Sequence, residues 1–274
     1  MVRVASVQMD VVFGNPEANA VRIAEHLKEL SSQGVHVAIF PECVLTGYCV
    51  STRDDALAIA IDAGHSSLVS IKELATSLCM TVILGFAERQ GDELYNSVAV
   101  FLCSGEEHIY RKTHLPELGY DKFVTPGDEF VTVETHGLTL GVLICFDIRA
   151  PENCRCLALA GCDLIAIPTN WPSGAEISAD VLCIARANEN MVYIATCNRV
   201  GDENGFHFIG KSKILSPAGD VLASADDNQA VLVCDIDPEL ARSKRMVRIP
   251  GKHETTIFES RRPDLYGPIC EARQ

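Results

Sequence analysis

The stretch at residues 141–152 places a cysteine where it could act as a nucleophile. An apolar run ends abruptly on Cys145, polar residues follow at once, and Pro151 with Glu152 suits the first turn of a helix. A thiol between the end of a strand and the start of a helix lies near the helix N-terminus. We therefore expect the pKa of this thiol to be lowered and the thiolate to be favoured. The alternative is that Cys145 is one more small core residue, as most buried cysteines are.

Two charged residues also follow strand-like runs. Glu42 comes after the apolar residues 35–40 and is flanked by further apolar sequence. A surface glutamate would be the ordinary interpretation, but these flanks favour a partly buried carboxylate with a raised pKa. Lys112 lies at the root of an irregular polar loop, and on its own it is best explained as a solvated surface charge.

A further apolar run, residues 163–168, ends in proline just as the run before Glu42 does. It continues with Asn170 and Trp171, the only tryptophan of the chain. Ligand sites in α/β sheets lie in crevices at strand ends, so we expect both strand ends to line one crevice. The alternative for Trp171 is that it caps a core.

The elements that must position these residues read as an α/β layer architecture. Residues 2–9 form a predicted strand, residues 15–17 open an amphipathic helix, and residues 35–40 form a buried strand. Three hairpin-linked strands follow between residues 80 and 112, which indicates that the sheet is not purely parallel.

A single domain over residues 1–274 is the economical organisation, because the chain has no low-complexity linker and no repeat of solenoid period. The pattern predicts a helix over residues 176–189 and a strand over residues 207–215. Residues 248–274 show no obvious element. A tail of that kind often packs on a partner subunit, and we expect this one to do so.

Composition excludes several classes of partner. The net charge of the chain is -14. Nucleic acids and anionic membranes bind basic patches, so we expect neither as a partner. No apolar run approaches the roughly 18–20 residues that a membrane span needs. The N-terminus begins directly as a strand and lacks the pattern of a signal peptide.

The 12 cysteines are spread through apolar strand-like runs. That distribution indicates reduced core residues and a cytoplasmic location rather than a disulfide framework. Cys154, Cys156 and Cys162 form a C-x-C-x5-C pattern, but no second pair of ligands accompanies it as structural zinc requires. We therefore expect no metal site.

Motifs along nearly the whole chain resemble those of the nitrilase superfamily of carbon–nitrogen hydrolases, in that family's order and approximate spacing. The matching residues are Phe40-Pro41-Glu42 with Thr46-Gly47-Tyr48, Tyr110-Arg111-Lys112-Thr113-His114-Leu115 with Pro126-Gly127-Asp128, Ile144-Cys145-Phe146-Asp147-Ile148-Arg149 with Pro151-Glu152, Asn170-Trp171-Pro172, Arg186-Ala187 with Glu189-Asn190, Asn198-Arg199, and Gly210 with Ser212. Together they favour Cys145 as a nucleophile over a core residue.

The resemblance implies an α/β fold, a four-layer α-β-β-α sandwich of two mixed sheets that dimerises into an eight-layer α-β-β-α-α-β-β-α assembly. It also implies a catalytic set of Glu42, Lys112 and Cys145 that needs no metal or organic cofactor. In that set the Cys145 thiolate attacks the carbonyl carbon and Glu42 is the general base. Lys112 and the backbone N–H of Phe146 hold the oxyanion.

The sequence departs from the family pattern at two places. Ala150 stands where the family usually has a bulky aromatic residue, so the shape of the wall behind the Cys145 turn is not fixed by the family pattern. Many members carry a second glutamate in the loop after the lysine, and here Glu117 and Asp121 both compete for that role. The side chains expected to shape the substrate pocket are Tyr48, Phe146, Asn170 and Trp171, together with the loop 113–125.

The residues after the nucleophile resemble the amidase and carbamoylase branches of the family. Nitrile-hydrolysing members typically read Cys-Trp-Glu, whereas this chain reads Cys145-Phe146-Asp147. We expect a homodimeric or larger hydrolase that cleaves a small linear carboxamide through a thioester, releasing ammonia and a carboxylic acid. The alternatives are an N-carbamoyl amine or amino-acid amidohydrolase, an acyltransferase, a catalytically idle scaffold, and a cysteine–histidine mechanism that uses His114.

Overall fold

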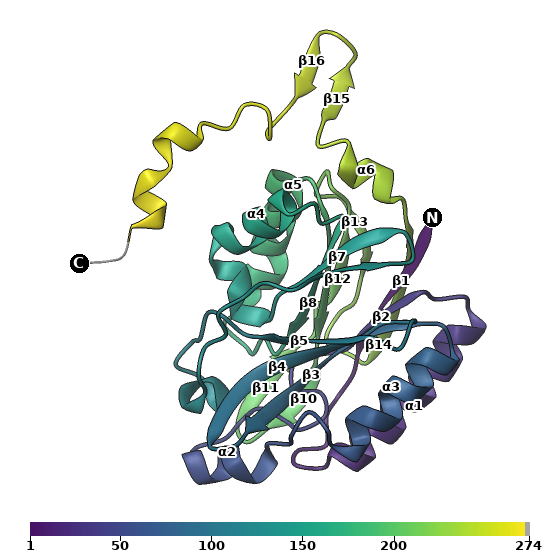
Figure 1. The fold of residues 1–274 in the computed structure, drawn as a ribbon, viewed down its shortest axis with the longest axis vertical. Helices are drawn as coiled ribbons and strands as arrows, with labels where there is room; N and C mark the ends of the chain where they lie inside the picture. Colours follow the sequence, from purple (N-terminus) through teal and green to yellow (C-terminus); the bar gives the residue numbers. More distant parts are fainter. Residues whose placement is uncertain (272–274) are drawn as a thin grey trace.

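Residues 1–271 are described by the computed structural model, in which two six-stranded mixed sheets pack face to face between helical layers (Figure 1). The first sheet has the strand order β14-β1-β2-β3-β4-β5 and the second β13-β12-β9-β8-β7-β6. Both sheets place three parallel strands beside antiparallel ones. The predicted α-β-β-α sandwich is therefore confirmed, whereas its dimerisation stays a prediction.

The first sheet is covered on its outer face by two long helices, α1 and α3 (Figure 1). Its strands are β1 (Val2–Gln8), β2 (Val37–Ile39), β3 (Thr81–Gln90), β4 (Glu93–Phe101), β5 (Glu107–Arg111) and β14 (Ala230–Ile236). The helices on this side are α1 (Pro16–Ser32), α2 (Arg53–Ile59) and α3 (Ser66–Ser77).

The second sheet carries α4 (Pro151–Leu159) and α5 (Cys183–Asn190) on its outer face (Figure 1). Its strands are β6 (Thr132–Thr135), β7 (Leu138–Val142), β8 (Leu164–Thr169), β9 (Tyr193–Asn198), β12 (Lys213–Leu215) and β13 (Val221–Ser224). Outside the two sheets lie α6 (Pro238–Arg242) and the hairpins of β10 (Val200–Glu203) with β11 (Phe206–Ile209) and of β15 (Met246–Ile249) with β16 (His253–Thr255).

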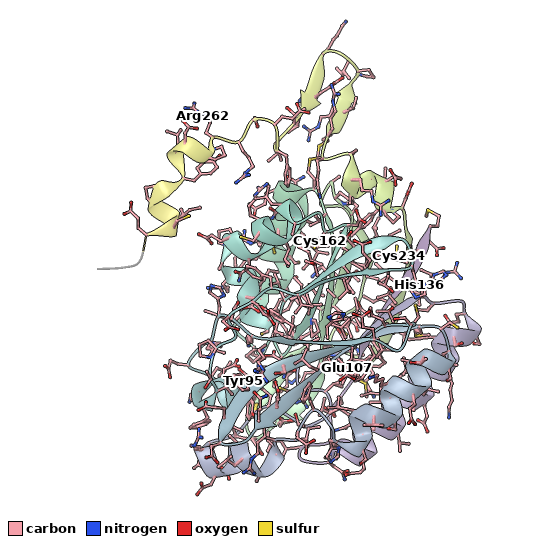
Figure 2. The ribbon with its side chains drawn as sticks, viewed as in Figure 1. Tyr95, Glu107, His136, Cys162, Cys234 and Arg262 are labelled. Atoms are coloured by element: carbon pink, nitrogen blue, oxygen red, sulfur yellow. The ribbon has the colours of Figure 1, made fainter. Side chains whose placement is uncertain are left out.

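Side chains that alternate between the two faces of each strand form two buried layers, one between the sheets and one between the first sheet and its helices. In β1, Val4 joins the core between the sheets, whereas Val7 packs with Ile23 and Leu27 of α1. Successive side chains of a strand point to opposite faces, so one strand supplies both layers. Side chains fill the interior of the molecule, and Cys162 belongs to the hydrophobic core on the α4 side of the second sheet (Figure 2).

The predicted helix over residues 176–189 is confirmed, and the helical segment includes a π-helical turn, Ser178–Leu182, directly before α5. Two other sequence-based expectations about local structure were wrong. The strand predicted over residues 207–215 is broken between β11 and β12, because Gly210 and Lys211 adopt φ of 60° and 59°. The C-terminal region, expected to have no element, contributes the β15–β16 hairpin.

The tail after this hairpin packs against the body of its own chain through Phe258. Phe258 lies under two cations, 5.0 Å from the Arg155 guanidinium carbon and 5.3 Å from Lys244 Nζ. Farther along, Arg262 projects from the tail away from the sheets (Figure 2). Leu265 and Ile269 are exposed. That residues 248–274 pack on a partner subunit stays a prediction.

The 12 cysteines all carry free thiols. Of the three cysteines in the C-x-C-x5-C pattern, Cys154 and Cys162 are buried and Cys156 is exposed. Within residues 1–271 no three histidine, cysteine, aspartate or glutamate side chains gather as metal ligands would. No helix in that part of the chain is long and apolar enough to span a bilayer.

Candidate active site

Three strand ends from the two sheets deliver the predicted chemical groups to one buried region. Glu42 follows β2, Lys112 follows β5 directly, and Cys145 follows β7 after two residues. Their exposed fractions are 0%, 1% and 8%. Because β2 and β5 belong to the first sheet and β7 to the second, the site lies between the sheets.

The turn after β2 aims Glu42 inward, and a glycine on the neighbouring strand makes that turn possible. Gly85 of β3 donates its backbone N–H to the Pro41 carbonyl at 3.1 Å. A Cβ at position 85 would lie 2.3 Å from the backbone nitrogen of Cys43 and 2.6 Å from the Cα of Glu42. Cys43 itself has φ of 47°, in the left-handed region. Only glycine lets β3 approach the Glu42 backbone this closely.

Four buried side chains, those of Glu42, Asn96, Lys112 and Asp121, form a closed hydrogen-bonded ring. Lys112 Nζ lies 2.7 Å from Glu42 Oε1 and 2.6 Å from Asp121 Oδ2. Asn96 Nδ2 donates to the same two carboxylates, at 2.7 Å to Glu42 Oε1 and 2.7 Å to Asp121 Oδ1. The lysine and the amide therefore fix both carboxylates, and the ring is rigid because every member has two partners.

The structure places Asp121, and not Glu117, in this ring. The Asp121 side chain is fully buried, and the Tyr48 hydroxyl donates to its Oδ2 at 2.8 Å. Glu117 is exposed, four residues earlier in the same loop. Of the two competing acids, Asp121 therefore has the geometry of the supporting carboxylate.

Glu42 has the properties of a general base. Burial raises its pKa, and the Lys112 ammonium and the Asn96 amide oppose that shift only in part. Its Oε1 is occupied by those two partners, whereas its Oε2 has no hydrogen-bond partner among residues 1–271. One carboxylate oxygen thus anchors the side chain and the other is available to accept a proton.

Lys112 is held as an ammonium. Burial alone would lower its pKa, but the carboxylates of Asp121 and Glu42 outweigh burial and hold that pKa well above its usual value. An ammonium has three donors, and two of them serve these carboxylates. The third donor is left for a ligand.

The expected lowering of the Cys145 pKa was wrong. Burial raises the pKa of the thiol well above its ordinary value and the Glu42 carboxylate adds to the shift, whereas Lys112 and the backbone N–H of Asn170 oppose it. The helix N-terminus expected nearby belongs to α4 and comes only at Pro151, because Cys145 opens a short 3-10 turn, Cys145–Arg149. The resting group is a thiol, and it needs a base to release its proton.

Cys145 stands on a strained turn that Asp147 holds in place. The Cys145 φ is 45°, a conformation that non-glycine residues seldom adopt. The Asp147 carboxylate accepts from the Ile144 backbone N–H at 2.9 Å and from the Tyr110 hydroxyl at 2.8 Å. Its other oxygen accepts from the His114 backbone N–H at 2.9 Å. Asp147 therefore ties the nucleophile's turn to the loop that follows Lys112.

His114 lies outside this arrangement of reactive groups. Its ring nitrogen Nδ1 lies 3.3 Å from Asp147 Oδ1 and 2.9 Å from the Thr113 hydroxyl, and its side chain is 44% exposed. The hydrogen bond to Asp147 raises the pKa of His114. Within residues 1–271 no hydrogen bond or ion pair joins it to Cys145, so the geometry gives the cysteine–histidine alternative no support.

A cavity of about 320 Å³ opens onto Cys145. All four residues predicted to shape the pocket lie in its wall. The lining residues are Tyr48, Pro116, Leu118, Cys145, Phe146, Arg149, Asn170, Trp171, Pro172, Ser173, Gly174, Ala175 and Ser178. The Asn170 side chain is 1% exposed, and neither its Oδ1 nor its Nδ2 has a partner among the described residues, so it can bind a ligand here.

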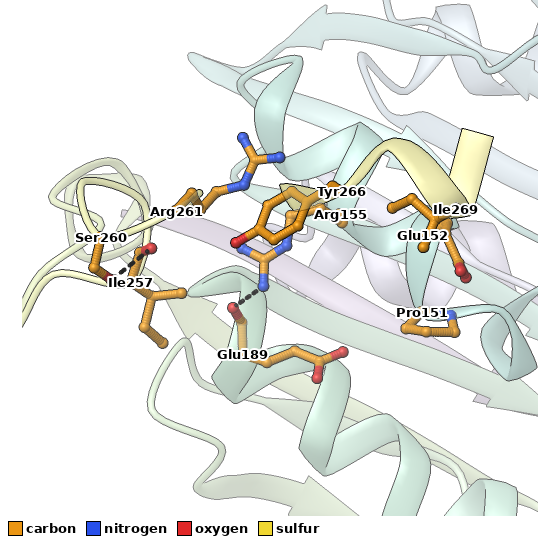
Figure 3. A pocket seen from close by; sticks show the side chains of 9 residues that line it. All are labelled: Pro151, Glu152, Arg155, Glu189, Ile257, Ser260, Arg261, Tyr266 and Ile269. Carbon is orange, nitrogen blue, oxygen red and sulfur yellow. Dashed lines mark hydrogen bonds between the residues drawn. The ribbon is translucent and has the colours of Figure 1, made fainter. Parts of the chain in front are cut away.

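A second cavity, of about 390 Å³, lies between α4, α5 and the tail (Figure 3). Arg155, Glu189 and Tyr266 are among its lining side chains, and the Arg155 guanidinium donates to the Glu189 carbonyl at 2.7 Å. No cysteine lines it. The predicted catalytic residues therefore belong to the first cavity alone.

Sequence reasoning missed two residues that organise the site. Asn96 lies in the middle of β4, a strand of otherwise mainly apolar character, and a polar residue buried in such a run is a recognisable signal. Asp147 was identified only as part of a motif, and its fully buried carboxylate is what positions the turn. Both act on the reactive groups through hydrogen bonds.

Comparison with known proteins places this geometry in context. Residues 3–246 match the model of the family described as carbon-nitrogen hydrolase. A nitrilase from Pyrococcus abyssi is 38% identical over 271 residues, which cover 97% of this chain and 99% of that protein. A 2-oxoglutaramate amidase from Bacillus subtilis is 30% identical, covering 96% and 98% of the two chains. An N-carbamoylputrescine amidase from Arabidopsis thaliana is 31% identical, covering 90% and 88%.

Solved structures give a matching fold. A CN-hydrolase superfamily protein from Xanthomonas campestris superposes with a TM-score of 0.80 over 89% of this chain and 93% of that chain. The two sequences are 24% identical. At that identity the likeness concerns the arrangement of the sheets and helices.

Proposed function

Because this chain belongs to the carbon–nitrogen hydrolase family, we propose that it hydrolyses the C–N bond of a small linear carboxamide through a thioester on Cys145. The observation that carries this proposal is the juxtaposition in the buried site. A thiol lines a ligand-sized cavity, and beside it a carboxylate oxygen without a partner belongs to a ring that also holds an ammonium. These are the groups that amide hydrolysis needs.

The first half of the reaction forms the thioester. Glu42 Oε2 takes the proton from the Cys145 thiol as the sulfur attacks the carbonyl carbon. The negative charge that develops on the carbonyl oxygen is held by the third donor of Lys112 and by the backbone N–H of Phe146. Losing one such donor typically costs about 2.7–4 kcal/mol in the barrier. The C–N bond then breaks, Glu42 gives its proton to the nitrogen, and ammonia leaves.

The second half reverses the roles with water. Glu42 takes a proton from a water molecule that attacks the thioester carbon, and the oxyanion is held as before. The C–S bond breaks, and the proton returns to the Cys145 sulfur. One amide and one water give one carboxylic acid and one ammonia, and the enzyme is restored. The raised pKa of the thiol supports this use of Glu42, since the thiol does not ionise alone.

The surroundings of the site are part of the proposal. The free thiols of all 12 cysteines fit a reducing, cytoplasmic location. The exposed apolar side chains of the tail, Leu265 and Ile269, fit a homodimer in which the tail packs on the partner subunit. The proposed domain is the whole chain, because the site draws on both sheets.

The test is a substrate panel with ammonia release as the readout. The wild type is expected to hydrolyse short carboxamides, and a substrate-derived acyl group is expected on Cys145 by intact-protein mass spectrometry. Cys145→Ala is expected to abolish both signals, and Glu42→Gln to lower kcat by about 10²–10⁴. Full activity in Cys145→Ala would sink the proposal. Carbon dioxide released with the ammonia from N-carbamoyl compounds would instead favour the carbamoylase alternative.

A further inference from the structure

A buried carboxylate on the β10–β11 hairpin holds the chain segment that carries Tyr48. Glu203, the last residue of β10, is 5% exposed. Its Oε1 accepts hydrogen bonds from two successive backbone N–H groups, that of Tyr48 at 2.8 Å and that of Cys49 at 2.7 Å. Hydrogen bonds to a carboxylate are short and strong, so one oxygen that binds two consecutive peptide groups fixes the backbone between them.

The hairpin also holds the other side of this segment. The Asn204 side chain, directly after Glu203, donates to the Cys49 carbonyl at 2.6 Å. Residues 47–50 lie outside the described helices and strands, so their buried peptide groups depend on partners of this kind. The backbone of Tyr48 and Cys49 is therefore held by the hairpin.

Arg199 compensates the buried carboxylate of Glu203. The Arg199 side chain is fully buried, donates to Glu203 Oε2 at 2.6 Å and lies 4.4 Å from the centre of the Phe208 ring. Its guanidinium also pairs with Asp10 at 3.1 Å. A buried carboxylate is costly without a cation, and Arg199 supplies that cation from the residue directly before β10. The two oxygens of Glu203 thus have separate tasks, because one binds the Tyr48 segment and the other binds the cation.

Tyr48 connects this clamp to the reactive groups. Its hydroxyl donates at 2.8 Å to Asp121 Oδ2, the oxygen that lies 2.6 Å from Lys112 Nζ. Burial and the nearby carboxylates of Asp121 and Glu42 raise the pKa of Tyr48 well above its ordinary value, so the hydroxyl keeps its proton. The Tyr48 carbonyl accepts from the Tyr120 backbone N–H at 2.9 Å, next to Asp121 in the chain. A displacement of Tyr48 would therefore displace Asp121.

We propose that Glu203 is a positioning residue for the reaction. It holds the Tyr48 backbone, the Tyr48 hydroxyl orients Asp121, and Asp121 orients the Lys112 ammonium that binds the oxyanion. Within the described residues Glu203 does not line the cavity, so its effect passes through Tyr48. This inference rests on the proposed function and adds to it a hairpin that lies outside the two sheets.

Two substitutions separate positioning from charge pairing. Glu203→Asp keeps a carboxylate beside Arg199 but withdraws it by one methylene group from the Tyr48 and Cys49 N–H groups. Glu203→Gln keeps the length, but its single carbonyl oxygen cannot serve both the Tyr48 segment and Arg199. We expect each variant to lower kcat by about 10- to 100-fold and to change KM by less than about threefold, because Lys112 acts on charge that develops only in the transition state.

A double-mutant cycle with Tyr48→Phe tests the route. Tyr48→Phe removes the hydroxyl and keeps the ring, and we expect it to lower kcat by about 10-fold. In that background Glu203→Asp is expected to lower kcat by less than about twofold further, since the hydroxyl through which Glu203 acts is already gone. Losses that multiply independently would show that Glu203 does not act through Tyr48 and would overturn this inference. The substrate is the short carboxamide that the wild type hydrolyses fastest.

Asp10→Asn is the matched control. It removes the other acid beside Arg199, with the same change in net charge as Glu203→Gln, from a side chain that is 46% exposed. We expect its kcat to stay within about twofold of wild type. Thermal melting checks that each variant is folded, and Glu203→Asp carries the test if Glu203→Gln unfolds.

The outcomes distinguish this inference from the proposed function. Wild-type kcat in a folded Glu203 variant, with Cys145→Ala still inactive, would overturn the role of Glu203 and leave the proposed function standing. If the wild type hydrolyses no amide and Cys145 stays unacylated, both fail.

Discussion

At the scale of single residues, the site separates the atoms that hold it together from the atoms that react. Glu42 Oε1 is bound by Lys112 and Asn96, whereas Oε2 is free. The Cys145 thiol has a raised pKa, so sulfur and carboxylate must act together. In the proposed reaction, the sulfur therefore becomes nucleophilic only as Glu42 accepts its proton.

The identity of the supporting acid can be tested by a matched pair of substitutions. Asp121→Asn removes a negative charge that raises the pKa of Lys112 and leaves the shape nearly unchanged. We expect kcat to fall by about 10- to 100-fold, because Lys112 and Glu42 lose their fixed geometry. Glu117→Gln makes the same chemical change on an exposed residue of the same loop, and we expect turnover within about twofold of wild type. The reverse pattern in steady-state ammonia release would assign the role to Glu117.

The pH dependence of the reaction reports on Asn96. Glu42 works as a deprotonated base and burial raises its pKa, so kcat/KM is expected to fall as the pH drops through a value above the usual glutamate range, about 4.3. The Asn96 hydrogen bond stabilises the carboxylate form and lowers that pKa. Its removal must therefore raise the pKa, and the acidic limb of the profile is expected to move to higher pH.

Asn96→Leu is the suitable variant, because it keeps a similar side-chain volume and removes the donor without adding a charge. The measurement is the pH profile of kcat/KM, together with a melting curve to confirm folding. A purely structural role for Asn96 would lower the whole profile without shifting its acidic limb, and that result would contradict the assignment.

At the scale of elements, strand ends deliver the chemistry and close backbone contacts set its position. β2 and β3 pair in parallel, and β3 passes the turn at Glu42 with no room for a side chain at Gly85. The 3-10 turn after β7, Cys145–Arg149, is held at its start by Asp147, which accepts from the Ile144 N–H. Arg186 of α5 holds its end by donating to the Ile148 carbonyl. The reactive groups are thus fixed by elements that lie far apart in the sequence.

Gly85→Ala is expected to impair activity more than stability alone would explain. The added methyl group would push the Glu42 backbone away, since the nearest atoms are backbone atoms at 2.3 Å and 2.6 Å. We expect a loss of about 1–3 kcal/mol in the free energy of unfolding, from overpacking, and a fall in kcat of about 10²-fold from misplacement of the base. Chemical denaturation and ammonia release measure the two effects.

Gly267→Ala is the control for that substitution. A Cβ at position 267 has no neighbour within 4 Å, and the residue lies in the tail. We expect both the unfolding free energy and the turnover to stay near wild type. A Gly85→Ala enzyme with wild-type kcat would show that the approach of β3 does not position Glu42.

At the scale of the whole molecule, the body and the tail have different packing. Most of the chain belongs to two sheets with helices outside, and the tail extends away from them (Figure 1). The tail packs on the body through Phe258, whereas its Leu265 and Ile269 side chains are exposed. Exposed apolar side chains grouped on one segment are typical of an interaction surface.

We expect the double variant Leu265→Asp with Ile269→Asp to weaken dimerisation. The two new carboxylates would have to be buried in the interface, which costs free energy. The dimer of the double variant should therefore dissociate at higher protein concentrations than the wild-type dimer. Light scattering coupled to size-exclusion chromatography measures the mass. Val21→Asp, at an exposed position on α1, is the control and should keep the wild-type mass. A monomeric wild type, or a double variant that stays dimeric, would contradict the assigned role of the tail.

The sequence by itself determined the sandwich and predicted that Glu42, Lys112 and Cys145 converge in one region. Apolar runs of strand length predict strands, and Glu42, Lys112 and Cys145 each come just after such a run, so their convergence at strand ends follows from a local pattern. The motif order added the family and the class of reaction. These properties depend on a few neighbouring residues, which is why they can be predicted without coordinates.

Only the tertiary structure placed Asp121 rather than Glu117 beside Lys112, gave Cys145 a raised pKa, and left the Asn170 side chain without a hydrogen-bond partner among residues 1–271. Each of these outcomes depends on groups brought together from distant segments. Burial and hydrogen bonding fix a pKa, and the path of a loop across the fold decides which of its acids reaches a lysine. Local spacing carries no information about such contacts, so the reactive geometry emerges only when both sheets close around it.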